Sequence, residues 1–298
     1  METNKWLYQY GEIASGNLLV HVDAENNSVL KHAGIRVGDA TNGIELPADS
    51  NERLILIAAG DEVEVKYSVE DLNIEKISLK GRKDVFHGPA DVLYLPFHTS
   101  ARIQGNARVI IGEGPAKNSK PVQIIRKAKV PVLLRGAGRE TRQVHNFGIP
   151  GELDADRLIC VEVIVPAGNW SGIPAHKHDT YIPGIESNLE EIYYFETKVA
   201  RGFENFSSQK PFGYFRGYSS DEREFNLDCA VHDGDTVLVP HGYHGPVAAV
   251  PGYDLYFFNV MAGPDTNREW NIQDDPNHAW IRKTWEYQVP DNRLPYKE

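Results

Sequence analysis

The chain consists largely of short runs of β-forming residues, separated by glycine, proline, asparagine or aspartate about every ten residues. Residues 54–58 are continuously apolar, as in a buried strand, whereas residues 62–69 alternate apolar and polar side chains. Turns at this spacing are typical of sandwiches and barrels, so we expect an all-β fold. Further strands are expected at residues 92–95, 107–111, 159–165, 192–195, 235–239 and 255–260.

A weak internal repeat suggests that one β unit occurs twice. Residues 91–96 and 235–240 both read Asp, four mainly apolar residues and Pro, and each follows a turn containing a glycine, Gly88 or Gly234. Chance similarity between two buried strands is the alternative. We expect two antiparallel, jelly-roll-like β-barrel domains: an N-terminal barrel (1–134), a connector (135–156) and a C-terminal barrel (157–298).

The expected connector begins with a polar, basic stretch in an otherwise acidic protein. Residues 135–145 contain Gly136 and Gly138, which invites comparison with a phosphate-binding loop. Such a loop needs a third glycine and a following helix, and the sequence indicates neither. We therefore expect a crossing segment or a loop at the edge of a site.

Composition narrows the classes of partner. Thirty-one Lys and Arg against 42 Asp and Glu give a net charge of −11, which argues against binding to nucleic acid or to an anionic membrane surface. A small anionic substrate remains compatible, because one or two local arginines suffice for a carboxylate. We expect no membrane-spanning segment and no secretory signal. Two cysteines, Cys160 and Cys229, lack metal-type spacing, so a cytoplasmic protein is expected.

Three histidines and a glutamate suggest a metal site in the second half. In a strand, His176 and His178 point to the same side. The pair Glu190 and Glu191 precedes an apolar, aromatic run, and His244 follows about fifty residues later. Three imidazoles and one carboxylate suit a first-row divalent metal and leave positions open for substrate. The first half has no His-x-His pattern, so its barrel is expected to be degenerate and metal-free.

These residues occur in a recognisable order. Residues 172–178 together with Glu191 resemble the first conserved motif of the cupin superfamily, and residues 234–244 resemble the second. The chain departs from the pattern through a longer loop at residues 179–189 and a second motif one residue shorter. Cupins are small antiparallel β-barrels, and the resemblance implies the metal ligands His176, His178, Glu191 and His244.

A narrower resemblance covers roughly residues 50–285 and is strongest from 135 onward. The matching segments are residues 142–145, 166–171, 176–179, 189–195, 242–244, 251–256, 259–264 and 275–280. Together they resemble the 5-deoxy-glucuronate isomerase family, bicupins of myo-inositol catabolism, although His241 stands where an arginine is expected in that family. The resemblance implies a divalent metal ion (Zn, Mn, Fe, Co or Ni) and an aldose–ketose isomerisation of 5-deoxy-D-glucuronate to 5-dehydro-2-deoxy-D-gluconate.

The chemistry implied by the resemblance needs a metal, a base and a cation. The metal would polarise a carbonyl and stabilise the enediolate, while a base moves a proton between two carbons. Strand alternation places Tyr193 on the same side as Glu191. The base could be Tyr193, a displaced Glu191 or an ordered water, and a hydride shift is also open. Lys177 lies on the face opposite the histidines and is expected to be a rim or structural residue.

For the substrate carboxylate we expect Arg216, then His241, then Arg142 or Arg139. Two other functions fit the same ligand set: a metal-dependent oxygenase and a non-catalytic bicupin that binds a sugar acid. The sheet edges of a bicupin also allow a homo-oligomer.

Overall fold

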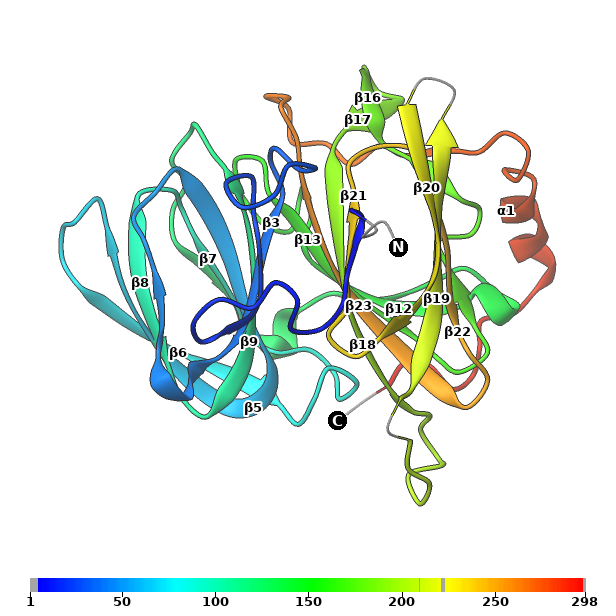
Figure 1. The fold of residues 1–298 in the computed structure, drawn as a ribbon, viewed down its shortest axis with the longest axis horizontal. Helices are drawn as coiled ribbons and strands as arrows, with labels where there is room; N and C mark the ends of the chain where they lie inside the picture. The colour runs from blue at the N-terminus through cyan, green and yellow to red at the C-terminus, as the bar shows by residue number, and fades with distance from the viewer. Residues whose placement is uncertain (1–4, 209, 221–222, 297–298) are drawn as a thin grey trace.

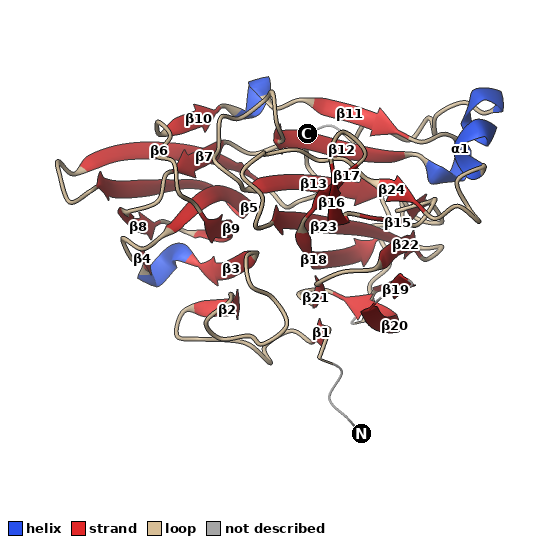
Figure 2. Ribbon diagram, turned by 90° about the horizontal axis from the view of Figure 1, so that it is seen from above, coloured by secondary structure: helices blue, strands red, loops and turns tan. Residues whose placement is uncertain are grey.

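The computed structural model describes residues 5–208, 210–220 and 223–296, and strands dominate it. Two lobes lie side by side, each made of antiparallel strands (Figure 1; Figure 2). The predicted all-β class is confirmed. The helical elements of the described residues are short: η1 (Ala40–Asn42), η2 (Lys127–Lys129), η3 (Gly138–Glu140), α1 (Ile281–Thr284) and η4 (Trp285–Tyr287).

A sheet of nine strands forms the first lobe as far as the structure describes it. Its main path runs β10-β7-β5-β9-β3-β2; β6 and β8 also pair with β5, and β4 pairs with β8. The strands are β2 (Leu18–Val22), β3 (Gly34–Asp39), β4 (Ile44–Leu46), β5 (Asn51–Val69), β6 (Glu75–Arg82), β7 (Val92–Leu95), β8 (Thr99–Gln104), β9 (Ala107–Pro115) and β10 (Gln123–Ile125).

The second lobe contains two sheets. The strand order of one is β1-β21-β18-β23-β13-β12-β11. That of the other is β20-β19-β22-β15-β24, with β14 also paired to β22. The first contains β1 (Leu7–Tyr8), β11 (Val132–Arg135), β12 (Arg142–Gly148), β13 (Ile159–Val165), β18 (Glu190–Val199), β21 (Thr236–Val239) and β23 (Tyr253–Ala262). The second contains β14 (Trp170–Ser171), β15 (His176–Lys177), β19 (Phe212–Ser220), β20 (Arg223–His232), β22 (Tyr243–Ala249) and β24 (Gln273–Asp274). A separate hairpin joins β16 (Asp179–Ile182) to β17 (Glu186–Asn188).

Strand β5 joins two segments that the sequence suggested were separate strands. Its register with β9 shifts between Ile57 and Ala59, and Gly60 has φ +123°. A Cβ on Gly60 would lie 2.6 Å from the Cβ of Ala107, so the close approach of the two strands requires glycine there. The bulge lets the first half of β5 pair with β7 and the second half with β6 and β8.

Strand β13 is buried on both faces, which explains its continuous apolar sequence. Ile159, Val161 and Val163 pack inside the second lobe. Cys160 and Ile164 belong to a different cluster, shared with Leu54, Ile110 and other residues of the first lobe. The seven-stranded sheet is therefore a wall between two cores.

The segment expected to connect two barrels contains a strand of this wall. Within residues 135–156, β12 pairs with both β11 and β13. Near the N-terminus, β1 pairs with β21 of the second lobe. The boundaries expected at 134 and 157 stay predictions, and both β1 and β12 belong to the sheet of the second lobe.

A buried ion pair crosses between the lobes. Arg82 at the end of β6 donates from both Nη atoms to the carboxylate of Glu162 on β13, and the Nη1–Oε2 distance is 2.9 Å. His145 Nδ1 lies 2.8 Å from Glu162 Oε2, and the Tyr256 hydroxyl donates to Oε1 at 2.8 Å. Burial favours a higher pKa for Glu162, but Arg82 and His145 outweigh it and lower that pKa to about 2. The carboxylate is thus ionised and fully partnered.

Candidate metal centre and active site

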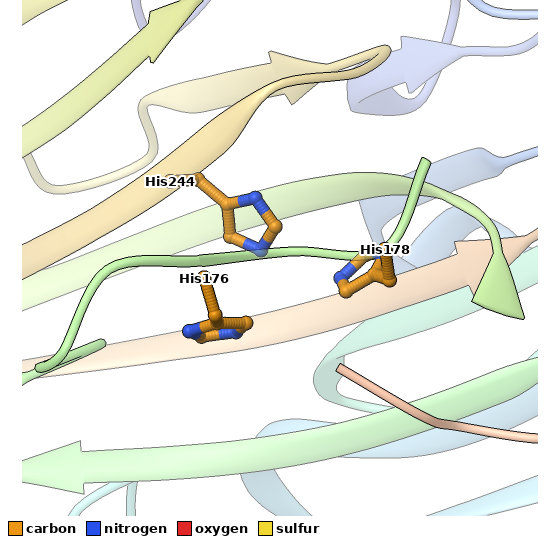
Figure 3. Close-up of side chains that lie close together, drawn as sticks. All are labelled: His176, His178 and His244. Carbon is orange, nitrogen blue, oxygen red and sulfur yellow. The ribbon is translucent and has the colours of Figure 1, made fainter. Parts of the chain in front are cut away.

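Three histidines converge between β15 and β22. His176 on β15 is the register partner of His244 on β22, and His178 follows β15 directly. One ligand nitrogen from each lies within 4.8 Å of the others. Figure 3 shows the three imidazoles gathered in one place. The sequence placed His176 and His178 on one side of a strand, and the antiparallel pairing with β22 brings His244 to them.

Glu191, on the neighbouring sheet, faces the same histidines. Its Oε2 atom is 3.0 Å from His178 Nε2 and 3.0 Å from His244 Nε2. Glu190 points the other way, where its carboxylate accepts hydrogen bonds from the backbone N–H groups of Lys31 and His32. The two glutamates point in opposite directions because successive side chains of a strand such as β18 lie on opposite faces of the sheet.

The outer nitrogen of each imidazole faces a backbone carbonyl. His176 Nδ1 lies 3.4 Å from Pro174 O, and His178 Nδ1 lies 3.2 Å from Leu189 O. His244 Nδ1 lies 3.2 Å from the carbonyl two residues earlier. A carbonyl only accepts, so each Nδ1 is the protonated nitrogen, which leaves a lone pair on each Nε2. Carbonyls that orient ligating imidazoles in this way are usual around protein metal sites.

The donor set fits a divalent cation. His244 Nε2 is buried and, among the described residues, has no hydrogen-bond partner, although Glu191 Oε2 is 3.0 Å away. With Nε2 unprotonated, this nitrogen and the carboxylate oxygen would repel each other at 3.0 Å unless a cation lay between them. Burial lowers the pKa of His176 well below its ordinary value, and His244 and His178 lower it further, so the imidazole is neutral as a ligand must be.

A cavity opens beside these ligands. His176 and Glu191 line it together with Tyr193 and Asn259. Tyr193 is buried, and its pKa is raised well above 10 first by burial and then by Glu191, so the phenol is neutral. The amide nitrogen of Asn259 has no hydrogen-bond partner within the described part of the chain. The cavity thus offers polar groups next to the proposed metal ligands.

Only one of the residues expected to bind the carboxylate lines this cavity. Arg142 does so. Arg216 lies on the outer face of β19, with its side chain 49% exposed and 3.6 Å from Asp228, because strand alternation turns the buried Phe215 inward instead. His241 places Nε2 3.0 Å from the carbonyl oxygen of Glu224 outside the cavity. Arg139 belongs to η3 and does not line it.

Lys177 points away from the histidines, as the alternation argument predicts. Its Nζ atom lies 2.7 Å from Glu186 and 2.9 Å from Asp179, and both carboxylates are buried. The lysine therefore neutralises two acids under the inserted hairpin β16–β17.

Sequence reasoning missed several residues that line the cavity. Arg135 lies in the basic, glycine-rich stretch that was interpreted only as a connector or site edge. Arg282 comes from α1, after a segment whose role the sequence left open. Trp270 and Asn259 also line it, and no local pattern distinguished them from core residues.

Comparison with known proteins gives a consistent family. The sequence model of the KduI/IolB family matches residues 6–281. The 5-deoxy-glucuronate isomerase of Halalkalibacterium halodurans is 33% identical over 91% of this chain and 95% of its own length. That of Geobacillus thermodenitrificans is 38% identical over 68% of this chain and 70% of its own.

Solved structures agree on the fold. An IolB-like protein from Salmonella typhimurium LT2 superposes with a TM-score of 0.79 at 35% identity, covering 93% of this chain and 98% of that one. An oxalate decarboxylase from Bacillus subtilis gives a TM-score of 0.58 at 9% identity, over 90% and 79% of the two chains, and supports the fold alone. The predicted bicupin fold is confirmed.

Proposed function

The chain belongs to the KduI/IolB family, and we propose that it is a 5-deoxy-glucuronate isomerase of inositol catabolism, which forms 5-dehydro-2-deoxy-D-gluconate. Relatives with that name match the chain over nearly its whole length. The observation that carries the proposal is the convergence of His176, His178 and His244, with Glu191 3.0 Å from two of them, beside a cavity that His176 and Glu191 line. The function class predicted from the sequence is the same.

We propose that His176, His178, Glu191 and His244 hold one divalent metal ion. The three converging imidazoles, the carboxylate 3.0 Å from two of them and the unpartnered His244 Nε2 support this ligand set. When bound, the metal supplies Lewis acidity toward a carbonyl oxygen and its neighbouring hydroxyl. Which of Zn, Mn, Fe, Co or Ni it is depends on availability as well as on the ligands.

The chain's own groups bind the sugar and handle the proton. Tyr193 presents a neutral phenol at the cavity wall, beside Glu191. In this state it donates a proton to a developing alkoxide more readily than it abstracts one from carbon. The unpartnered Asn259 amide is placed to donate to a substrate oxygen. Apolar walls formed by Val161, Val163 and Phe257 restrict water in the cavity.

Replacing Tyr193 by phenylalanine is expected to lower kcat by about 100-fold, because positioned proton transfer contributes roughly 10²- to 10⁴-fold. The phenol lies beside the proposed ligands without belonging to them, so metal content should not change. Steady-state kinetics and elemental analysis of the same samples test this. Full activity in Tyr193→Phe would exclude a proton-transfer role for the phenol.

Chelation is expected to abolish isomerase activity, and re-addition of a single divalent metal should restore it. The measurement is ketone formation from 5-deoxy-glucuronate with matched metal analysis. Activity should be the same without oxygen, since isomerisation needs no oxidant; dependence on oxygen would instead favour the oxygenase. Turnover in a verified metal-free sample would overturn the proposed metal role.

Two expectations from the sequence stay predictions. A homo-oligomer is one, and β11, at the end of its sheet, exposes Val132, Leu133 and Leu134 where a second copy could pair. A cytoplasmic location is the other. Among the described residues, no helix has the length and apolar character needed to cross a bilayer.

A further inference from the structure

We infer that Arg135, Arg142 and Arg282 form an anion subsite that binds the carboxylate of a sugar acid in the cavity of the metal centre. The inference rests on the proposed isomerase function and specifies its substrate class. Arg282 lies 140 positions after Arg142 and 147 after Arg135 in the sequence, so only the tertiary structure assembles this cluster.

Arg142 is the central cation of the subsite. Its guanidinium lies over the ring of Trp285, 5.7 Å from the centroid, and Nη1 donates to the Glu140 carbonyl at 3.3 Å. No carboxylate of the described residues forms an ion pair with it, because the nearby Glu140 side chain accepts from the indole of Trp285. Burial, together with Arg135 and Arg282, lowers the pKa of Arg142 to about 10. The positive charge of Arg142 is therefore energetically unfavourable unless an anion binds beside it.

Arg135 and Arg282 complete the cluster from two other elements. Arg135, at the exposed end of β11, lies 6.0 Å from the ring centroid of Trp270 and has no ion pair within the described residues. Arg282, on α1, forms two hydrogen bonds to Asp274 and lies 5.2 Å from the centroid of Trp285. The tryptophans hold these guanidinium groups in place, and the N–H groups that are not bonded to Asp274 can bind a ligand.

The charge balance of the cluster favours an anion. The cluster has three guanidinium groups but only one paired carboxylate among the described residues, that of Asp274 on Arg282, although the chain as a whole carries a net charge of −11. Like charges at this density are costly in a cavity and are retained where a ligand neutralises them. Guanidinium groups bind a carboxylate through paired N–H donors. A monoanionic carboxylate therefore fits the two cations that Asp274 does not neutralise.

The same cavity contains other donors without partners. Trp270 Nε1 and Asn259 Nδ2 are buried, line the cavity and lack hydrogen-bond partners among the described residues. Such donors remain unsatisfied unless a ligand rich in oxygen, or water, occupies the cavity. A sugar acid supplies a carboxylate for the arginines and hydroxyls for these donors.

The short strand β24 connects the anion subsite to the metal centre. Asp274, which holds Arg282, is the register partner of His176 in the pairing of β24 with β15. The anion subsite and a metal ligand are thus built on paired strands, and both line one cavity. A substrate anchored by its carboxylate would present its carbonyl end at a defined position relative to His176 and Glu191.

Calorimetric titration of the metal-loaded protein with D-glucuronate and with D-glucose tests the subsite without requiring turnover. D-glucuronate is expected to bind at least about 30-fold more tightly than D-glucose, and Arg142→Gln should weaken D-glucuronate binding by about 100-fold. Arg142→Lys should recover only part of the loss, because lysine cannot bind a carboxylate bidentately. Arg135→Gln, at an exposed position where folding is not at risk, should weaken binding by about 10-fold.

Arg216→Gln is the matched control, since it removes the same charge outside the cavity and should leave binding unchanged. Equal affinity for the two sugars in the wild type, or loss of D-glucuronate binding in Arg216→Gln but not in Arg142→Gln, would overturn the inference. Metal content and circular dichroism must match across the variants.

Measurements of turnover distinguish a failure of the anion subsite from a failure of the proposed isomerase function. The wild type should convert 5-deoxy-glucuronate about 100-fold more efficiently, in kcat/KM, than its uncharged methyl ester, and Arg142→Gln should remove most of that preference. Selective D-glucuronate binding without turnover of 5-deoxy-glucuronate would leave the subsite intact and refute the isomerase. Turnover of acid and ester with equal efficiency would refute the subsite and leave the isomerase.

Discussion

His176→Ala should lose bound metal and at least about 1000-fold in kcat/KM, the loss expected when roughly 4 kcal/mol of transition-state stabilisation disappears. The reason is geometric. His176 lies opposite His244 on paired strands, and its ligand nitrogen is within 4.8 Å of those of His178 and His244. Alanine removes one of four proposed ligands and leaves two imidazoles and Glu191, a weaker set that should lose the ion to a chelator more readily than the wild type. Elemental analysis after gel filtration and steady-state kinetics measure the two losses.

His232→Ala provides the matched control for this substitution. His232 lies at the end of β20 with its side chain 42% exposed, and its ring contacts Asp235 rather than the proposed ligands. Metal content and kcat/KM should both remain at the wild-type level. Equal metal content in His176→Ala and His232→Ala would show that His176 is not a ligand.

Arg82→Met is expected to reduce the free energy of unfolding by about 3–5 kcal/mol, because it leaves a buried carboxylate without its cation. Arg82 and Glu162 are 0% and 1% exposed, and the pair joins β6 of the first lobe to β13 of the second. Methionine fills much of the volume of the arginine, so the loss reflects the unpaired charge rather than a cavity. Urea unfolding at near-neutral pH, followed by tryptophan fluorescence, measures it.

The pH dependence of this effect has a defined sign. The pKa of Glu162 is about 2 in the folded protein against an ordinary 4.5, so the stability contributed by the pair is complete above about pH 4.5 and is lost as the pH falls through about 2. The difference between wild type and Arg82→Met should therefore shrink as the pH falls through that range.

Lys66→Met provides the control for Arg82→Met, because Lys66 and Glu64 form an ion pair at 3.3 Å with both side chains nearly half exposed. A change below about 0.5 kcal/mol is expected there. A similar loss in Lys66→Met and Arg82→Met would show that the buried pair has no special contribution.

The strand pattern and the metal-ligand candidates could be predicted from the sequence because both depend on local geometry. Alternation with period two placed His176 and His178 on one side and separated Glu191 from Glu190. The same rule, applied to Phe215 and Arg216, would have turned the arginine outward, as the structure does.

Which strands share a sheet could not be predicted in the same way. Strands β1 and β12 join the wall of the second lobe, although one lies near the N-terminus and the other inside a segment that looks like a linker. Strand pairing is long-range, and the preference of a residue for β structure does not identify its partner strand.

Side-chain period and residue chemistry act over a few positions, so the sequence alone predicted an all-β chain with a histidine-rich metal site. The resemblance to a known family supplied the bicupin fold and the full set of proposed ligands. Only the tertiary structure decided which cations share their cavity. Arg135, Arg142 and Arg282 lie on β11, β12 and α1, and the pairing of β11 with β12 and the return of the C-terminal segment bring them together. Contacts between residues more than a hundred positions apart depend on how the sheets close, and no local pattern in the chain encodes that.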